Sequence, residues 1–449
     1  MNKIRMNISH PREWPLLRIQ DICIIVSRGT APVYTDYGKV LAIGQRCVRE
    51  WGFMINEARF HDQRYMNRAL RPEKGDVLLN STGTGTIGRS CVFHAHGDFL
   101  IDGHITLLRP DLKKLDGRWL NCILQSPEGQ LHLETQCYSG STNQVELSRE
   151  RLMATAISLP PLPEQHRIAE ILDTIDEAIK KTEALIEKLK AMKQGLLHDL
   201  LTRGLDENGK LRDPKTHPEQ FKKTDIGWLP SPWDVKKIEE IKADSPNALS
   251  MGPFGSNITV KNFINEGVPV IRGINLSGPI VDFSNTVYIS DKKADELSSS
   301  NVFWNDIVIT HRGTVGQVSL FKEKSPFERA VVSQSQLKIS CNSAIIRPYF
   351  LTTYLTSAFG QKLISNAKGH TGVQAIGQPL SSVKKMKIPA PPLHEQQRIE
   401  SILIEWGERI NREERYCKKL MKIKGGLMHD LLTGEVRVKV DTPKEKTPS

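Results

Sequence analysis

Two His-Asp dipeptides are the first residues of this chain whose types and spacing could do chemistry. His198-Asp199 and His429-Asp430 each place an imidazole beside a carboxylate, as a general base and the acid that orients it would be placed. Both pairs lie near the end of a long segment with helical apolar periodicity, where the helix dipole favours a histidine. We therefore interpret them as capping or interface groups and not as catalytic pairs.

Two further candidates lack what their chemistry needs. His94 and His96 could be two metal ligands, but no nearby Cys, His or Asp completes a site, so we expect surface or turn histidines. Gly204 and Gly209-Lys210 have the spacing of a phosphate-binding loop, but Leu211 follows where Ser or Thr is needed, and no strand precedes the segment. Neither an amino-methyltransferase motif nor a Gly-x-Gly-x-x-Gly fingerprint occurs. We predict that the chain has no catalytic residues, no metal site and no cofactor of its own.

The composition is that of a basic protein that can bury a core. Of 449 residues, 39% are hydrophobic and 25% charged, and the net charge of +11 favours an anionic partner, most commonly nucleic acid. The seven cysteines form no Cys-x-x-Cys pair, so we expect reduced thiols in a cytoplasmic protein. The N-terminus lacks the apolar stretch of a signal peptide, and we expect no membrane-spanning helix.

The segments 160–202 and 391–433 are two copies of one sequence. At a constant offset of 231 residues, 22 of the 43 aligned pairs are identical without a gap, including Pro-Pro-Leu-x-Glu-Gln at the start and His-Asp-Leu-Leu-Thr at the end. Each copy follows a region of similar length. The chain is therefore predicted to consist of two similar halves, each a globular region followed by a long helix.

Apolar residues recur in heptads within both copies, as in a coiled coil. At about 1.5 Å per residue, the stretch from Glu164 to Leu201 spans about 57 Å, so this helix needs a partner. The simplest partner is the other copy, packed antiparallel, with polar interruptions at Thr182, Lys193, Glu413 and Lys424 that could fix the register. The predicted seam residues are Ile168, Leu172, Ile175, Ile179, Ile186, Leu189, Leu196, Ile399, Leu403, Trp406, Ile410, Leu420 and Leu427.

The globular regions also correspond to each other. Val77-Leu78-Leu79 and Ile307-Val308-Ile309 are short β-favouring runs, each followed by a glycine-containing turn, and the first turn is two residues longer. Leu41-Ala42-Ile43-Gly44 matches Val270-Ile271-Arg272-Gly273 as a second strand. The expected fold is α/β (α+β) with a pseudo-two-fold internal repeat. The expected segments are the globular regions 1–159 and 233–390, the helices 160–203 and 391–434, a polar linker 204–232 and a largely disordered tail 435–449.

These motifs resemble the DNA-specificity subunit of Type I restriction-modification systems. The resemblance rests on the doubled Pro-Pro-Leu-x-Glu-Gln segment, on Gly252-Pro253-Phe254-Gly255-Ser256 and on the stretch from Asp306 to Gly316, and it covers the chain from Trp14 to about Val438. The first region departs more, because Arg28-Gly29-Thr30 only partly resembles the early Gly-Thr-Pro turn and Thr82-Gly83-Thr84-Gly85 carries two extra residues.

The resemblance implies two target recognition domains, each recognising one half of a split, asymmetric site on double-stranded DNA, with the paired helices as a spacer. It also implies partners: two methyltransferase subunits that bind S-adenosylmethionine and methylate adenine, and restriction or motor subunits that use ATP and Mg²⁺. Arg pairs with guanine, Asn or Gln with adenine, and Ser or Thr more permissively. The candidate DNA contacts are Arg28, Thr30, Gln45, Arg46, Thr82, Thr84, Arg89, Ser141, Asn143 and Gln144 in the first region, and Ser256, Asn257, Arg272, Asn275, His311, Arg312, Thr314, Lys368, His370, Thr371 and Gln374 in the second.

Other interpretations stay open at this point. Any one of these side chains could be a solvated loop residue, and an arginine could contact phosphate instead of a base. The whole chain could be a nonspecific two-headed scaffold for nucleic acid or protein, or an enzyme with its own transferase activity. The sequence does not identify the bases that are recognised.

Overall fold

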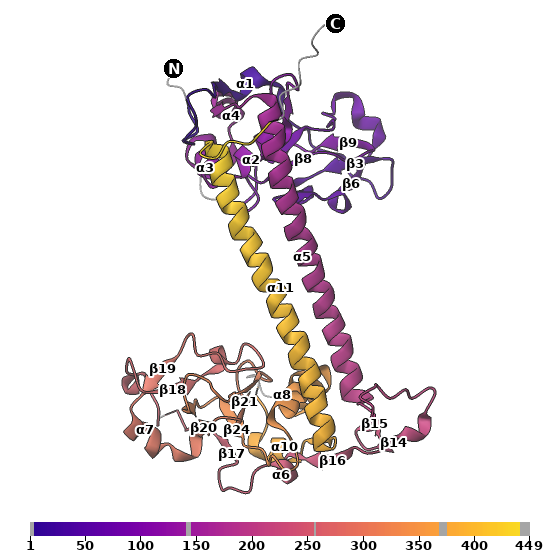
Figure 1. The fold of residues 1–449 in the computed structure, drawn as a ribbon, viewed down its shortest axis with the longest axis vertical. Helices are drawn as coiled ribbons and strands as arrows, with labels where there is room; N and C mark the ends of the chain where they lie inside the picture. The colour runs from indigo at the N-terminus through magenta and orange to yellow at the C-terminus, as the bar shows by residue number, and fades with distance from the viewer. Residues whose placement is uncertain (1–3, 141–144, 256, 368–374, 441–449) are drawn as a thin grey trace. The chain divides into compact units, whose positions relative to one another are not determined.

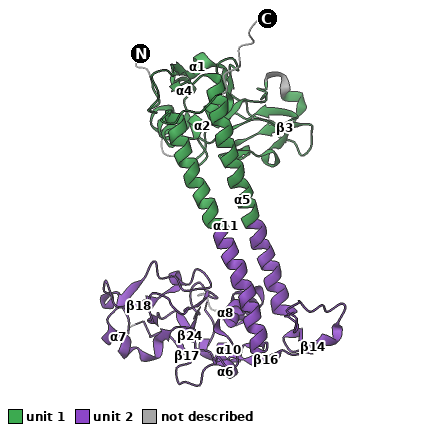
Figure 2. Cartoon of the chain, viewed as in Figure 1, with its two compact units in different colours: residues 1–186, 413–449 green, residues 187–412 purple. Residues whose placement is uncertain are grey.

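The protein consists of two compact units, and each unit takes part of both long helices (Figures 1 and 2). The structure is a computed structural model that describes residues 4–140, 145–255, 257–367 and 375–440. Unit 1 comprises Met1–Ile186 and Glu413–Ser449, and unit 2 comprises Glu187–Arg412. The chain therefore does not divide into globular regions and a separate helical domain, because each helix is shared between the units.

Unit 1 is built on two small sheets. The three strands β6, β3 and β9 form one, in which β3 and β9 run parallel, and β2, β10, β7 and β8 form an antiparallel one. The strands and helices of the globular region are β1 (Leu16–Arg18), α1 (Ile19–Ile22), β2 (Cys23–Arg28), β3 (Val40–Ile43), β4 (Val48–Arg49), β5 (Gly52–Phe53), β6 (Arg59–His61), β7 (Val77–Asn80), β8 (Ser90–Val92), β9 (Asp98–Ile101), β10 (Ile105–Pro110), α2 (Gly117–Gln125), α3 (Pro127–His132), β11 (Tyr138–Ser139), β12 (Glu146–Leu147), α4 (Arg149–Ala154) and β13 (Ala156–Ser158).

Unit 2 repeats this plan, and its sheet with the parallel pair has four strands where that of unit 1 has three. Its antiparallel sheet has the order β17, β24, β21, β22, and the other sheet has the order β19, β18, β23, β20, with β18 and β23 parallel. Its elements are β14 (Phe221–Thr224), β15 (Gly227–Pro230), β16 (Asp234–Lys237), α6 (Ile238–Ile241), β17 (Leu249–Met251), β18 (Val268–Ile271), β19 (Val287–Ile289), α7 (Asp291–Glu296), β20 (Asn301–Phe303), β21 (Ile307–Thr310), β22 (Val318–Leu320), β23 (Arg329–Val332), β24 (Gln336–Ile339), α8 (Pro348–Thr356), α9 (Ala358–Asn366), α10 (Pro379–Lys385) and β25 (Lys387–Ala390).

The central strands are apolar on both faces because each separates two cores. In β7, Val77 and Leu79 join the core beneath α2, whereas Leu78 joins the core shared with the second sheet. In β21, Ile307 and Ile309 join one core and Val308 the other. The two-residue period of a strand thus distributes one continuous apolar run between two cores.

The offset of 231 residues extends beyond the long helices. It carries α2 (Gly117–Gln125) onto α8 (Pro348–Thr356) with matching ends. A buried aromatic pair repeats as well, since Trp14 packs edge-on against Trp119 and Trp233 packs edge-on against Phe350. The expected pair of similar α/β regions is confirmed, and its two members share a core design as well as an order of elements.

The long helices are α5 (Leu162–Thr202) and α11 (Leu393–Thr433), and they run antiparallel within each unit. In unit 1, Asp176 of α5 forms an ion pair with Lys424 of α11 at 2.6 Å, and Glu164 at the start of α5 bonds Arg437 beyond the end of α11. In unit 2, Gly407 of α11 lies against the Lys193 side chain of α5.

The predicted seam is buried only in part. Ile168 and Leu172 belong to the core of the unit 1 globular region, and Ile399 and Leu403 belong to that of unit 2. The seam residues at the helix starts therefore anchor each helix to its own globular region. Buried seam residues are Ile168, Leu172, Ile186, Leu189, Ile399, Leu403, Ile410 and Leu420, whereas Ile175, Ile179, Leu196, Trp406 and Leu427 are half-buried.

The doubled Glu-Gln motif fastens the start of each helix. The Gln165 side chain accepts a hydrogen bond from Asp116 N and donates to the carbonyls of Lys114 and Pro160, and Gln396 repeats all three contacts with Arg347 N, Ile345 O and Pro391 O. Both glutamines are fully buried. The glutamine side chain therefore supplies hydrogen-bond partners to backbone groups that would otherwise lack them.

The neighbouring glutamate ties each helix start to the chain that follows the other helix. Glu164 bonds Arg437 at 2.6 Å in unit 1, and Glu395 bonds Arg212 at 2.7 Å and accepts from Leu205 N at 2.7 Å in unit 2. Both carboxylates are almost completely buried, so each needs its arginine.

The segments predicted as linker and tail are more ordered than expected where they are described. Within 204–232, β14 and β15 form a hairpin, and Leu205 and Leu229 lie in the unit 2 core. Within 435–449, Arg437 binds Glu164 and Val438 packs on the unit 1 core, and residues 441–449 lie outside the described part. Among the described residues, no helix has both the length and the apolar composition that crossing a bilayer requires.

We expect Gln396→Leu to lower the free energy of unfolding by about 2 to 4 kcal/mol, because it deletes three hydrogen bonds and leaves one buried and two half-buried backbone groups without this partner. Urea titration followed by tryptophan fluorescence measures this loss. The matched control is Gln397→Leu at the exposed neighbouring position, which should leave the midpoint nearly unchanged. Equal midpoints for the two variants would contradict this function of the glutamine.

Candidate nucleic-acid interface

A glycine-framed turn follows the central strand of each unit and meets a second loop. In unit 1, Gly83 and Gly88 have φ values of 95° and 85°, and in unit 2, Gly313 and Gly316 have 87° and 100°. These left-handed conformations favour glycine. Thr82 pairs with Glu146 in unit 1, and Arg312 pairs with Ala375 in unit 2. The predicted turns therefore correspond in the structure, with Thr82 at the place of Arg312.

A third segment, which contains Gly29 in unit 1 and Gly252 in unit 2, passes the same edge of each unit in close backbone contact with a neighbouring strand end. A Cβ atom at Gly29 would lie 1.9 Å from Ile101 O, and one at Gly252 would lie 1.9 Å from Ser333 O. Since no side chain fits there, both glycines are needed for the close approach. The approach brings Arg28 and Thr30 to the turn in unit 1, where Thr30 pairs with Asp102.

In unit 1 the predicted contact residues bind one another. Gln45 Nε2 donates to the carbonyl and hydroxyl oxygens of Thr82, both at 2.7 Å, and the Thr82 hydroxyl contacts His104 Nδ1 at 2.8 Å. Arg28 forms an ion pair with Glu146 at 3.0 Å. The arrangement is a preformed polar network in which one arginine is neutralised by a carboxylate.

In unit 2 the corresponding edge is an open cavity of about 420 Å³ that carries positive charge. Arg272, Arg312, Gln317 and Gln336 line it together with hydroxyl groups of Thr310, Thr314, Ser333 and Ser335. No carboxylate belongs to this lining, and Arg312 is exposed without an ion pair among the described residues. Guanidinium, amide and hydroxyl groups are the donors and acceptors that match base edges and phosphates.

Gln317 and Gln336 were missed by the sequence analysis. Gln317 directly follows the glycine turn that ends at Gly316, so its place after the motif was a usable signal. Gln336 lies on β24, which pairs with β21 through Thr310, and that pairing connects positions far apart in sequence. The hydroxyl of Ser333 donates to the side-chain oxygen of Gln336, and the Gln336 amide donates to the Thr310 hydroxyl. Gln336 is buried, so it supports the floor of the cavity, whereas the half-buried Gln317 is the glutamine that a base could reach.

Two predicted contacts in unit 2 are structural instead. Asn275 is buried, its side-chain oxygen accepts from Arg272 N at 2.9 Å, and its amide donates to Asp282 O at 2.8 Å. His311 is buried and its Nε2 donates to Gln334 O at 3.1 Å. Burial lowers the pKa of His311, which the neighbouring Arg312 lowers further. Both side chains hold loops in place and present no free group to a base.

The remaining candidates lie at the surface or outside the described residues. Arg46, Thr84, Asn257 and Thr314 are exposed, and Arg89 faces Glu50 at 3.7 Å. Arg272 donates to Asn285 O at 3.0 Å, while its Nε is buried without a partner in the described part. The predicted contacts Ser141, Asn143, Gln144, Ser256, Lys368, His370, Thr371 and Gln374 lie outside the described residues.

The residues considered for catalysis or metal binding have structural surroundings. His198 packs beside Phe359, and His429 lies 3.8 Å from Glu435, near the helix ends as expected. In the described ranges, no group of three or more His, Cys, Asp or Glu side chains is arranged to hold a metal ion. Gly204 ends α5 with φ of 59°, and the Asp206 carboxylate accepts from Lys210 N, so an acidic group occupies the loop that resembled a phosphate site.

Comparison with known proteins identifies the family. The family model for the type I restriction modification DNA specificity domain matches residues 11–191 and again residues 230–416. The chain belongs to this family. The family model matches twice in succession, which agrees with the two units. The chain is therefore a DNA sequence-specificity subunit of a type I restriction-modification system.

Relatives and solved structures agree with this membership. A relative from Methanocaldococcus jannaschii that carries the name type I restriction enzyme MjaX specificity subunit is 28% identical over 373 residues, covering 81% of this chain and 79% of the relative. The EcoBI specificity subunit from Escherichia coli is 26% identical, covering 56% of this chain and 52% of its own length. A chain in a solved type I R-M system superposes with a TM-score of 0.57 at 16% identity, covering 95% and 100%. The S subunit from M. genitalium gives 0.52 at 17%, covering 95% and 96%, so both structures support the fold.

The buried His311 predicts that unit 2 loses stability in mild acid. Its ordinary pKa is 6.5 and the folded value is lower, so the stabilisation is complete above pH 6.5 and declines as the pH falls, because only the unfolded chain takes up the proton. His311→Gln keeps an amide donor for Gln334 O and should reduce the fall in urea midpoint between pH 7.5 and 5.5. The exposed His394→Gln is the control, and an unchanged pH dependence in His311→Gln would exclude this cause.

Proposed function

We propose that each unit recognises one half of a bipartite, asymmetric site on double-stranded DNA. The observation that carries the proposal is the repeated edge, in which the same glycine turn, close approach and loop pairing present different side chains in the two units. Thr82 stands in unit 1 where Arg312 stands in unit 2. One scaffold with two different surfaces favours two dissimilar half-sites.

The chemistry of each edge supports a different kind of contact. In unit 2, Arg312 and Arg272 can donate to guanine or phosphate, and the amide of Gln317 can pair with adenine. In unit 1, the Gln45–Thr82–His104 network offers amide, hydroxyl and imidazole groups, and Arg28 must leave Glu146 before it can bind an acceptor on DNA. The exposed Arg46 and Thr84 are further contacts in this proposal.

The proposal includes docking of two methyltransferase subunits, with restriction or motor subunits completing the complex. S-adenosylmethionine, ATP and Mg²⁺ belong to those partners in this proposal, and this chain contributes no catalytic group. Both long helices carry exposed large apolar side chains, which are typical of an interaction surface when they gather along one element. They are Leu185, Tyr416, Met421 and Ile423 in unit 1, and Met192, Leu393 and Ile404 in unit 2.

Arg312→Ala in the complex with methyltransferase subunits is expected to weaken binding of the target duplex by about 1 to 3 kcal/mol, or roughly 5- to 150-fold. Fluorescence anisotropy with target and random duplexes at fixed salt measures this. The control is Arg329→Ala, which removes a unit 2 arginine already paired with Asp291 and Asp295. Equal loss for target and random DNA would assign Arg312 to phosphate contact, and no loss would remove it from the interface.

Inserting one heptad into α5 and one into α11, after Ile186 and Arg412, should lengthen the spacer of the recognised site. Seven residues add about 10 Å of helix, or roughly three base pairs. Genome-wide mapping of N6-methyladenine in a host that carries the methyltransferase subunits gives the motif. A single insertion in α5 is the control and should lose activity, because it shifts the pairing of the helices. An unchanged motif in the double insertion would refute the spacer function.

A further inference from the structure

Each unit contains a cavity between its globular region and the two long helices, and part of the lining of the two cavities comes from equivalent positions. The unit 1 cavity holds about 460 Å³ and the unit 2 cavity about 490 Å³. Leu172 and Lys424 line the first, and Leu403 and Lys193 line the second at the same offset of 231 residues. Further matched lining pairs are Met428 with Leu197, Cys122 with Thr353, Gln125 with Thr356 and Arg118 with Tyr349.

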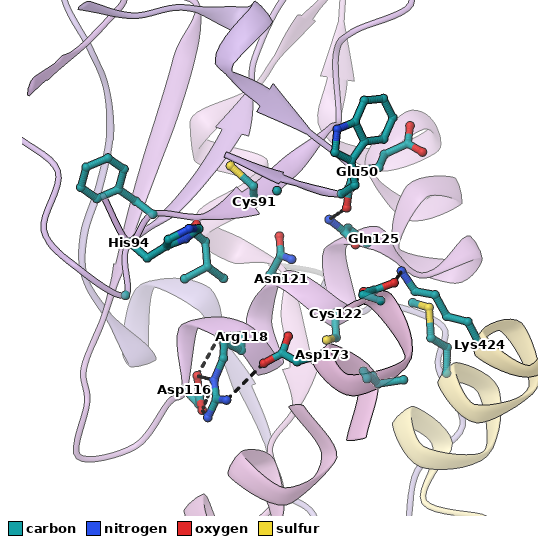
Figure 3. Close-up of a pocket in the computed structure, with 18 of the residues that line it drawn as sticks. Glu50, Cys91, His94, Asp116, Arg118, Asn121, Cys122, Gln125, Asp173 and Lys424 are labelled. Atoms are coloured by element: carbon teal, nitrogen blue, oxygen red, sulfur yellow. Dashed lines mark hydrogen bonds and ion pairs between the residues drawn. The ribbon is translucent and has the colours of Figure 1, made fainter. Parts of the chain in front are cut away.

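In unit 1 two cations of this cavity, Arg118 and Lys424, are neutralised by carboxylates of the chain itself. Arg118 bonds Asp116 at 2.8 Å and Asp173 at 3.2 Å, as Figure 3 shows. Lys424 forms its ion pair with Asp176 at 2.6 Å. The lysine amine at the helix interface thus has a carboxylate from the opposite helix as its partner.

In unit 2 the acidic partners are replaced. The positions that correspond to Asp173 and Asp176 are Ile404 and Gly407. A Cβ atom at Gly407 would lie 3.3 Å from the Lys193 amine, so the lysine faces the place where the carboxylate stands in unit 1. The lining of this cavity includes no Asp or Glu, and Lys193 has no ion pair or hydrogen bond among the described residues.

The other lining groups of the unit 2 cavity suit an organic anion. Gln194, Tyr349 and Thr353 have side-chain donors without a partner in the described part of the chain. Leu197, Leu276 and Leu403 supply an apolar wall. Burial lowers the pKa of Lys193, which is the expected effect of a cavity that has removed water from the amine without supplying a counter-charge. A bound anion restores the charge balance that unit 1 obtains from Asp176.

We propose that the unit 2 cavity binds a small organic carboxylate, whose carboxylate group pairs with the Lys193 amine and whose apolar part packs on Leu197, Leu276 and Leu403. The cavity shares Gln317 with the edge assigned to DNA recognition, but Lys193 and the three leucines are not part of that edge, so the inference goes beyond the proposed function. In this proposal the ligand supplies the negative charge in unit 2 that Asp176 supplies to the corresponding lysine in unit 1.

Competitive acetylation of lysines with peptide mass spectrometry tests the proposal on the full chain. Benzoate is the probe, because it joins a carboxylate to an apolar ring, and benzamide is its neutral control. Benzoate should slow the acetylation of Lys193 several-fold, benzamide should not, and Lys424 should be unaffected by either. Equal protection by both compounds, or protection of neither lysine, would overturn the proposal.

Substitution of Gly407 supplies the matched test. Gly407→Asp returns a carboxylate to the position that Asp176 holds in unit 1, so it should abolish the protection of Lys193 by benzoate and raise the thermal midpoint. Gly407→Asn has the same size without the charge and should keep the protection. If both variants keep it, the lysine is not the anion-binding group.

A further experiment distinguishes a free small molecule from an acidic side chain of a partner subunit as the source of the carboxylate. Acetylation is repeated with methyltransferase subunits present and no benzoate added. Unchanged Lys193 labelling there supports a free small molecule as the ligand, whereas full protection by the subunits would overturn that assignment in favour of an acidic side chain of the partner.

Discussion

The buried Glu-Gln pair at the start of each long helix is the interaction on which the rest of the structure depends. Gln165 and Gln396 each bind three backbone groups, so the first turn of the helix is fixed to its own globular region. Glu164 and Glu395 each bind an arginine that follows the other helix. An unpaired buried carboxylate costs several kcal/mol. Separating the start of one helix from the segment that follows the other would break this ion pair and leave the glutamate unpaired. One dipeptide therefore fixes a helix to its domain and to its antiparallel neighbour.

The sequence predicted the long helices well, because several signals agreed there. The predicted ranges 160–203 and 391–434 differ by at most two residues from Leu162–Thr202 and Leu393–Thr433. A proline cluster ends the preceding strand, and the apolar periodicity continues along the helix. What periodicity could not separate was the function of each seam residue. Leu172 and Ile186 occupy the same kind of heptad position. Leu172 belongs to the core of the unit 1 globular region, whereas Ile186 is buried on the long helix outside that core.

The candidate interface was predictable in its backbone and less so in its side chains. The glycine turns at Gly83 and Gly313 were correctly matched, because positive φ restricts the residue type. Asn275 and His311 were assigned to DNA because their groups match base edges. Both are buried, and they bind the backbone of Asp282 and Gln334, so their function is structural. Gln336 comes to the edge only through the pairing of β24 with β21, and there it is buried against Thr310 and Ser333. Composition identifies suitable groups, and tertiary structure decides which of them are free.

The duplication explains how two surfaces of different charge coexist on one scaffold. Gly29 and Gly252 leave no room for a side chain, so the path of the backbone is fixed in both units by steric exclusion. Positions next to these constraints are under no such restriction, as the exchange of Thr82 for Arg312 shows. The same holds at the helix interface, where Asp176 in unit 1 corresponds to Gly407 in unit 2. The lysine opposite this position is paired with Asp176 in unit 1 and has no carboxylate opposite it in unit 2. Because the backbone constraints lie at glycines and the charges lie beside them, substitution can alter what a unit binds without altering how the unit folds.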